Sequence, residues 1–139
     1  MSSFILDTDH LTLLQHNHPT VRARVLAANA RDVAITLITI EEQPSGWYAK
    51  IRQAKKPKEI ATAYAGFFET YETTKRLRVL PFSEMAVDRY LLLRKAHPRA
   101  GKMDLAIAAI ALGEKAVLVT RNRQDFDTIE GLVLENWSQ

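Results

Sequence analysis

The chain has 139 residues and no cysteine, so it is long enough to bury the core of one domain, and a disulfide scaffold, a thiolate metal site and a cysteine nucleophile are all excluded. Its longest uncharged apolar runs are far shorter than the roughly 20 residues that span a bilayer, and its start has no basic signal-peptide region. We therefore expect one soluble, cytoplasmic domain over residues 1–139 with no membrane segment, and the net charge of +3 favours an anionic partner only slightly.

The first third of the chain predicts two strands separated by helices. Phe4–Leu6 is a short apolar run that ends in Asp-Thr-Asp, as expected for a buried strand that enters a loop. Asp7 or Asp9 would cap a short helix after it, and Pro19 suits the first position of a second helix. The run Val33–Ile40 is almost wholly apolar and rich in β-branched residues, which predicts a central parallel strand covered on both faces.

Two helices and a third strand are expected next. One helix should open at Glu41 and run to about Ala54, with Pro44 tolerated only in its first turn. Helical spacing of apolar residues predicts another helix over Pro57–Thr74. The run Arg78–Phe82 predicts a short strand, and Ser83 is a favourable N-cap for the helix after it.

The last third completes an alternation of strands and helices. An alanine-rich helix is expected over Lys102–Leu112, stopped by Gly113, and buried strands are expected over Ala116–Val119 and Leu132–Leu134. Helices that alternate with short, wholly apolar strands predict an α/β fold, a three-layer α/β/α sandwich around a central parallel sheet.

Four acidic residues stand out by their position relative to these elements: Asp7, Glu42, Asp104 and Asp125. Three of them follow predicted strands, and Asp104 lies in the first turn of the alanine-rich helix. Ligands of open parallel sheets bind at the carboxyl ends of the strands, so we expect the four to meet there. Clustered carboxylates repel one another unless a cation compensates, and Mg²⁺ prefers oxygen ligands of this kind.

A divalent cation among carboxylates suggests hydrolysis of a phosphodiester, because the cation activates water and stabilises charge on a phosphoryl oxygen. Basic residues flank the acidic positions and are candidates for binding RNA phosphates. They are Arg99, Lys102, Arg121 and Arg123. Thr39 and Thr120 are placed to hydrogen-bond acidic residues.

The chain resembles the PIN-domain family, specifically the VapC-type toxin ribonucleases, nearly from end to end. The resemblance lies in four segments, ILDTDHLTLL, VAITLITIEEQPSGW, GKMDLAIAAIAL and VLVTRNRQDFDTIEGLVLENW. It implies that Asp7 and Asp104 bind Mg²⁺ or Mn²⁺ directly, that Glu42 and Asp125 complete the catalytic set, and that Asn122 supports it. It also implies an RNA substrate, a cognate antitoxin that inhibits the enzyme, and a homodimer.

The sequence departs from the family pattern at two positions near these acids. Relatives usually carry an aliphatic residue where this chain has Pro44, which could change how Glu42 points. They often carry a small or hydroxyl residue where this chain has Lys102, which could pair with the acids or contact RNA. Neither change removes an expected metal ligand.

Several assignments stay open at this stage. Glu41 competes with Glu42, and Asn122 or Asp127 competes with Asp125 as the fourth group. Asp7-Thr8-Asp9 after a strand also resembles the opening motif of haloacid-dehalogenase phosphatases, although the later motifs of that family are missing. A PIN-type processing nuclease without a toxin role and a non-catalytic binding module are further alternatives.

The remaining chemistry-bearing residues have simpler expected roles. None of the four histidines has the spacing of a metal-binding helix, so all are expected at the surface or as helix caps. The aromatic residues of the helix over Pro57–Thr74 are expected in the core or in a dimer contact. Trp47 is expected in the core, with an antitoxin or dimer contact as the alternative.

Overall fold

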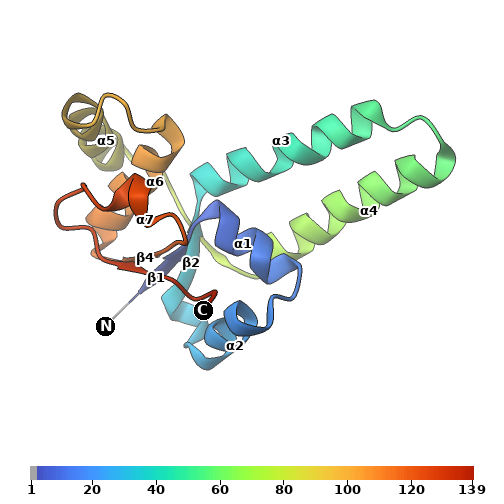
Figure 1. Ribbon diagram of the computed structural model, residues 1–139, viewed down its shortest axis with the longest axis horizontal. Coiled ribbons are helices and arrows are strands. Elements are labelled where there is room, and N and C mark those ends of the chain that lie inside the picture. Colours follow the sequence, from blue (N-terminus) through green and yellow to red (C-terminus); the bar gives the residue numbers. More distant parts are fainter. Residues whose placement is uncertain (1–2) are drawn as a thin grey trace.

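The fold is built on a five-stranded sheet in which all strands are parallel, as seen in a computed structural model that describes residues 3–139. The strands lie in the order β3-β2-β1-β4-β5, so the first strand of the sequence is at the centre. Their bounds are β1 Phe4–Leu6, β2 Val33–Thr36, β3 Arg78–Leu80, β4 Val117–Val119 and β5 Leu134–Glu135. Helices cover both faces of the sheet (Figure 1), which confirms the predicted α/β/α sandwich.

Alternating residues of the strands belong to two separate hydrophobic clusters, one on each face of the sheet. Ile5 and Leu118 point to the face covered by α5, Glu84–Ala96, and α6, Lys102–Glu114. Leu6 and Val119 point to the other face, which also receives residues of the first two helices. Burial on both faces explains why the strands are wholly apolar rather than alternating.

The first two helices begin where the sequence predicts. Asp7 caps α1, Thr8–Gln15, by accepting a hydrogen bond from the backbone N–H of His10, which selects Asp7 over Asp9. Helix α2, Pro19–Ala27, opens with proline after His18, whose Nδ1 accepts from the N–H of Val21. A short 3-10 helix, η1, Ala30–Asp32, leads into β2.

The expected strand over Val33–Ile40 is wrong in its second half. The strand ends at Thr36, whose hydroxyl accepts a hydrogen bond from the N–H of Thr39 and so starts helix α3, Leu37–Gln53. Pro44 consequently lies inside this helix and not in its first turn. A β-branched apolar run fits either structure when it is buried, and the cap at Thr36 decides between them.

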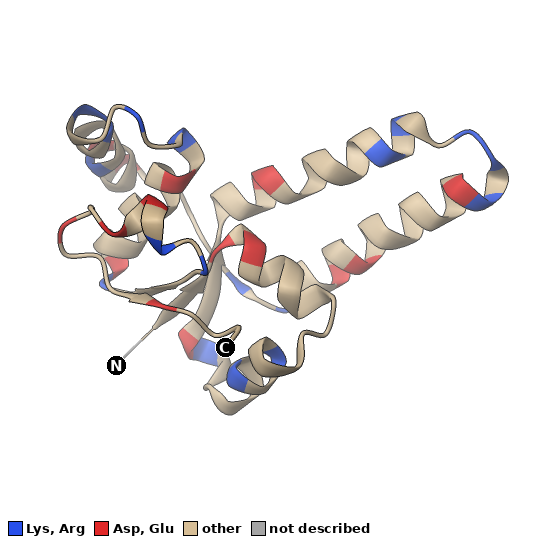
Figure 2. Ribbon diagram, viewed as in Figure 1, with Lys and Arg blue, Asp and Glu red and all other residues tan. Residues whose placement is uncertain are grey.

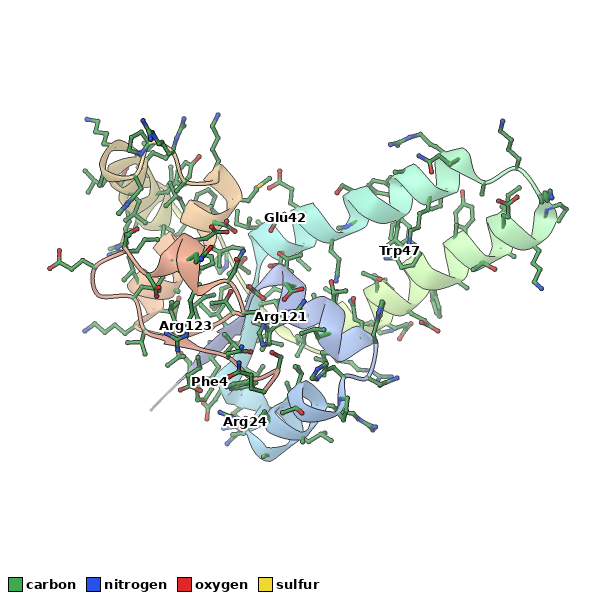
Figure 3. All side chains as sticks on the ribbon, in the orientation of Figure 1. Phe4, Arg24, Glu42, Trp47, Arg121 and Arg123 are labelled. Carbon is green, nitrogen blue, oxygen red and sulfur yellow. The ribbon has the colours of Figure 1, made fainter. Side chains whose placement is uncertain are left out.

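Helices α3 and α4, Pro57–Thr74, form a hairpin that projects from the sheet (Figure 1). Trp47 lies between the two helices (Figure 3), and its Nε1 donates to Thr70 Oγ1 at 2.8 Å. Its ring covers Gly66, where a Cβ would come within 2.2 Å of the ring. Trp47 is partly buried between the two helices and lies outside both core clusters, so it packs within the hairpin and not in the main core. Tyr64, Phe68 and Tyr71 are exposed and not in the core, contrary to one of the two expectations.

The C-terminal half departs from prediction at element ends and in one short helix, α7, Arg123–Phe126, that was not predicted. Ser83 caps α5 through Ala86 N as expected, at 3.2 Å. Helix α6 continues through Gly113, and it is Lys115, at a φ of 54°, that adopts the left-handed cap conformation. The last strand begins two residues later than predicted, after α7. Over residues 3–139, no helix has both the length and the apolar character needed to cross a membrane.

Candidate active site

The carboxyl ends of β1, β2 and β4 lie side by side and bring distant acidic residues to one edge of the sheet. Acidic residues gather where α1, α3, α6 and α7 approach this edge, whereas basic residues mark the tip of the hairpin (Figure 2). The hairpin tip carries the basic run between Lys50 and Lys58.

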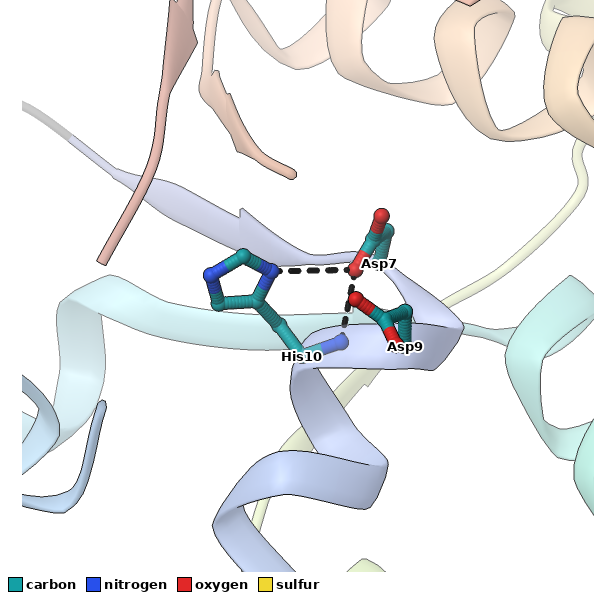
Figure 4. A group of neighbouring side chains, drawn as sticks. All are labelled: Asp7, Asp9 and His10. Atoms are coloured by element: carbon teal, nitrogen blue, oxygen red, sulfur yellow. Dashed lines mark hydrogen bonds and ion pairs between the residues drawn. The ribbon is translucent and has the colours of Figure 1, made fainter. Parts of the chain in front are cut away.

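Asp7 lies at the centre of this edge, directly after the central strand. It is buried, with 7% of its surface exposed. Its Oδ1 accepts the N–H of His10 at 2.7 Å and lies 3.3 Å from His10 Nδ1 (Figure 4). The cap of α1 therefore fixes this carboxylate by one of its two oxygens.

Glu42 reaches the same place from α3 and is held by a residue that the sequence did not single out. Thr8 Oγ1 donates to Glu42 Oε1 at 2.7 Å and lies 3.0 Å from Thr39 Oγ1. This contact favours Glu42 over the exposed Glu41, and Pro44 does not turn the side chain away from the site. Thr8 could have been suspected because it directly follows Asp7.

Asp104 lies in the first turn of α6, as predicted, and the pKa of its carboxyl is clearly raised. Burial, as the largest cause, and the charges of Asp125, Glu42 and Asp7 together raise its pKa from 3.8 to about 6. Asp104 and Asp125 line one open cleft, and the charges of Glu42 and Asp7 also act on Asp104, so the four acids face the same region of the molecule.

Asp125 is connected to β4 through a short hydrogen-bonded chain. Thr120, fully buried after the strand, accepts the N–H of Asn122 on its Oγ1 at 2.9 Å. The Asn122 amide in turn donates to Asp125 Oδ2 at 2.7 Å. Thr120 and Asn122 thus position Asp125. Within residues 3–139, Thr39 is hydrogen-bonded to Thr8 and to no acidic side chain.

The four predicted basic residues lie in different surroundings. Arg99 lines an open cleft together with Asp104 and Asp125. Lys102 lines another cleft, formed with α5, and forms no ion pair with the acids among residues 3–139. Arg121 is bound to both oxygens of Asp9, at 2.7 and 2.8 Å.

Arg123 lies beside a separate polar pocket. Its Nη2 is 3.5 Å from the carbonyl oxygen of Leu134. The pocket also contains Arg24, Arg121 and Glu135, and Figure 3 labels all three of its arginines. Arg24 is paired with Glu135 at 3.3 Å, so part of this positive charge is already neutralised.

Among residues 3–139, one group of His, Asp and Glu side chains has at least three ligand atoms close enough together to share a divalent cation. Asp7, Asp9 and His10 have ligand atoms within 4.8 Å of one another (Figure 4). However, Asp9 is occupied by Arg121, and both ring nitrogens of His10 have hydrogen-bond partners. Asp104 and Asp125, which line one cleft, are the other candidate ligands, because neighbouring carboxylates disfavour the ionised form of Asp104 and Mg²⁺ is bound through one or two carboxylates.

The histidines follow expectation except at one position. His18 caps α2, and His16 and His97 lie at the ends of helices. His10 is wholly buried, contrary to the expectation of a surface or capping residue, because its ring is enclosed between Asp7 and the C-terminal segment.

Comparison with known proteins identifies similar chains over nearly the full length. A family model described as PIN domain matches residues 4–132. Ribonuclease VapC2 of Rickettsia felis is 29% identical over 142 residues, which cover 98% of each protein. The structure of DNA-bound VapBC from Salmonella typhimurium contains a chain with 27% identity and a TM-score of 0.75, covering 99% of both chains. A toxin–antitoxin complex from Klebsiella pneumoniae gives 25% identity and a TM-score of 0.71, covering 94% of this chain and 96% of the other.

Proposed function

The chain belongs to the PIN-domain family, and from this membership we propose that it is a metal-dependent endoribonuclease that acts as the toxin of a toxin–antitoxin pair. The relatives described above are a ribonuclease and components of VapBC and toxin–antitoxin complexes, and they match this chain from end to end. An RNA substrate and such a partner would place the protein in the cytoplasm.

The observation that carries the proposal is the raised pKa of Asp104, which lies in a cleft together with Asp125. Its pKa of about 6 reflects burial and three neighbouring carboxylates, and a site of this kind is unfavourable until a cation compensates it. Strong perturbation of a carboxylate in a cleft by specific charged neighbours is characteristic of functional sites.

In the proposed site, Asp7 and Asp104 are the direct metal ligands. Glu42, held by Thr8, and Asp125, held by Asn122, orient water and help to accept its proton. Mg²⁺ or Mn²⁺ is the proposed ion, and when bound it would compensate the carboxylates and promote attack of water on the phosphodiester.

Arg99 is the basic residue best suited to bind an RNA phosphate near the reacting bond, because it shares the cleft of Asp104 and Asp125. Arg121 and Arg123 would contact phosphates further along the strand, and Lys102 is a weaker candidate because it faces another cleft. A cognate antitoxin and a second copy of the chain are the proposed protein partners.

The phosphatase alternative is not favoured. It requires the second aspartate of the Asp7-Thr8-Asp9 motif as an acid, whereas both oxygens of Asp9 are bound by Arg121. The family match also covers residues 4–132 with a PIN model.

The test is cleavage of a labelled single-stranded RNA by the purified chain with Mg²⁺, with Mn²⁺ and with EDTA. We expect cleavage with either metal, none with EDTA, and none by Asp104→Asn. Glu130→Gln removes an exposed carboxylate outside the predicted set and should cleave like the wild type. Cleavage that persists in EDTA, or in Asp104→Asn, would overturn the proposed site.

The toxin role needs a separate test in cells. Expression of the chain should arrest growth, and co-expression of the small protein encoded beside it should restore growth. Normal growth despite active, metal-dependent nuclease would favour a processing nuclease without a toxin role.

A further inference from the structure

We propose that His10 is a positioning residue of the site, which the backbone of Trp137 holds in one tautomer so that it fixes Asp7 with one oxygen turned toward the acidic cluster. This inference rests on the proposed function, since it takes Asp7 to be a metal ligand. It assigns a role in the site to the C-terminal segment, 127 positions away in sequence.

The tautomer of His10 follows from its two neighbours. The backbone N–H of Trp137 lies 3.3 Å from His10 Nε2, and a backbone N–H is always a donor. Nε2 therefore accepts, and the proton of the neutral ring is on Nδ1. Nδ1 lies 3.3 Å from Asp7 Oδ1 and donates to it.

The two oxygens of Asp7 consequently have different roles. Oδ1 receives two donors from one residue, the backbone N–H and the ring Nδ1–H of His10. Within residues 3–139, no hydrogen bond is made to Oδ2, and in Figure 4 this oxygen points away from the imidazole. The arrangement leaves Oδ2 available to a cation at a fixed orientation.

Trp137 is itself firmly held, which makes it a suitable anchor for His10. Its side chain is 2% exposed, and its Nε1 donates to Glu135 Oε1 at 2.9 Å. Its ring lies 5.0 Å from the ring of Phe4, at the start of the central strand. The anchor and the carboxylate that it orients are thus attached to the same strand, β1.

A merely structural histidine would satisfy the same hydrogen bonds without affecting the metal. The two interpretations differ in what happens when only one bond is kept. An asparagine at position 10 can place an amide N–H near the place of Nδ1 and keep the donor to Asp7. A glutamine can place an oxygen near the place of Nε2 and keep the acceptor for Trp137.

The experiment measures Mn²⁺ binding by calorimetry for the wild type, His10→Asn and His10→Gln, together with kcat and KM for RNA. Loss of a group that orients a metal ligand typically weakens metal affinity by about 10- to 100-fold. We expect such a loss, and a lower kcat at similar KM, for His10→Gln, and an affinity within about threefold of the wild type for His10→Asn. Equal Mn²⁺ affinity in all three proteins would overturn the role of His10.

The tautomer is tested on the wild type, so the proposal does not depend on how well the variants fold. Nitrogen NMR of the His10 ring should show a protonated Nδ1 and an unprotonated Nε2, and the opposite tautomer would overturn the proposal. Failure of the proposed function has another signature, which is wild-type protein whose Mn²⁺ binding is absent or unaffected by Asp104→Asn.

Discussion

Replacement of Asp104 by asparagine should stabilise the metal-free protein at neutral pH while it destroys the proposed metal site. The substitution keeps the shape of the side chain and removes its charge. In the wild type, burial and the carboxylates of Asp125, Glu42 and Asp7 disfavour the ionised form and raise the pKa of Asp104 to about 6. An amide at this position does not experience that repulsion.

The magnitude follows from the raised pKa. A value that rises from 3.8 to about 6 corresponds to about 3 kcal/mol of lost stability once the group is ionised. The side chain is only half-buried, so solvent screening reduces this to about 1.5 kcal/mol. Loss of an acid from the first turn of α6 opposes the gain by about 0.5 kcal/mol, which leaves a net gain of about 1 kcal/mol.

The gain should depend on pH in a defined direction. Below about pH 4, the carboxyl of Asp104 is protonated in the folded and unfolded states, and the variant has no advantage. Between about pH 4 and 6, the unfolded wild type has released this proton while the folded protein still holds it, so the wild type loses stability over this range, and the loss is complete above about pH 6. The free energy of unfolding of the variant should therefore exceed that of the wild type by about 1 kcal/mol at pH 7.5, or about 3 to 5 °C in Tm.

The assay is thermal unfolding in EDTA from pH 4 to 8, with Asp127→Asn as the control for loss of an exposed carboxylate. The difference between Asp104→Asn and the wild type should grow with pH, and that for the control should not. Addition of Mn²⁺ should then stabilise the wild type and leave Asp104→Asn nearly unchanged. A difference that stays constant with pH, or a variant less stable than the wild type at pH 7.5, would refute the reasoning.

Three further substitutions test other parts of the structure. Thr8→Val removes the donor to Glu42, so kcat for RNA cleavage should fall about tenfold, and Thr8→Ser should largely retain it; equal rates would contradict the contact. Gly66→Ala places a methyl group against the Trp47 ring, and thermal unfolding should show a loss of about 1 to 3 kcal/mol. Arg99→Ala should raise KM for RNA and reduce the slope of log affinity against log salt concentration by about one, because one phosphate contact is lost. An unchanged KM would show that Arg99 does not bind the RNA.

Much of the fold could be predicted because its signals are local. Short apolar runs bounded by polar residues give the strands, and Pro19, Pro57 and Ser83 mark three helix starts within a residue of their observed positions. The alternation of these elements is sufficient to predict a parallel sheet between helical layers. Three of the acids were also recognisable, since Asp7 directly follows a strand, and Asp104 and Asp125 lie in the first turn of a helix. Glu42 lies beyond the first turn of α3, so its predicted place directly after a strand is wrong.

Prediction failed where the local sequence fits two structures, a strand or a helix, or two positions for a helix end. The run after Val33 fits a buried strand and a buried helix equally, and a single hydroxyl at Thr36 ends the strand. Pro44 was expected at a helix start, but it lies within α3. Helix α6 does not stop at Gly113, as expected, but continues to Glu114, and Lys115 after it adopts the left-handed conformation.

The sequence by itself determined the identity of the strands, the sandwich and the acids at its edge, because these depend on hydrophobic pattern and on neighbours a few residues apart. Only the tertiary structure decided which side chains hold the acids: Thr8 on Glu42, Arg121 on Asp9, and His10 between Asp7 and Trp137. Except for the bond from His10 to Asp7, these contacts join residues 34 to 127 positions apart. They exist because the sheet places β1 between β2 and β4, an order that no local pattern encodes.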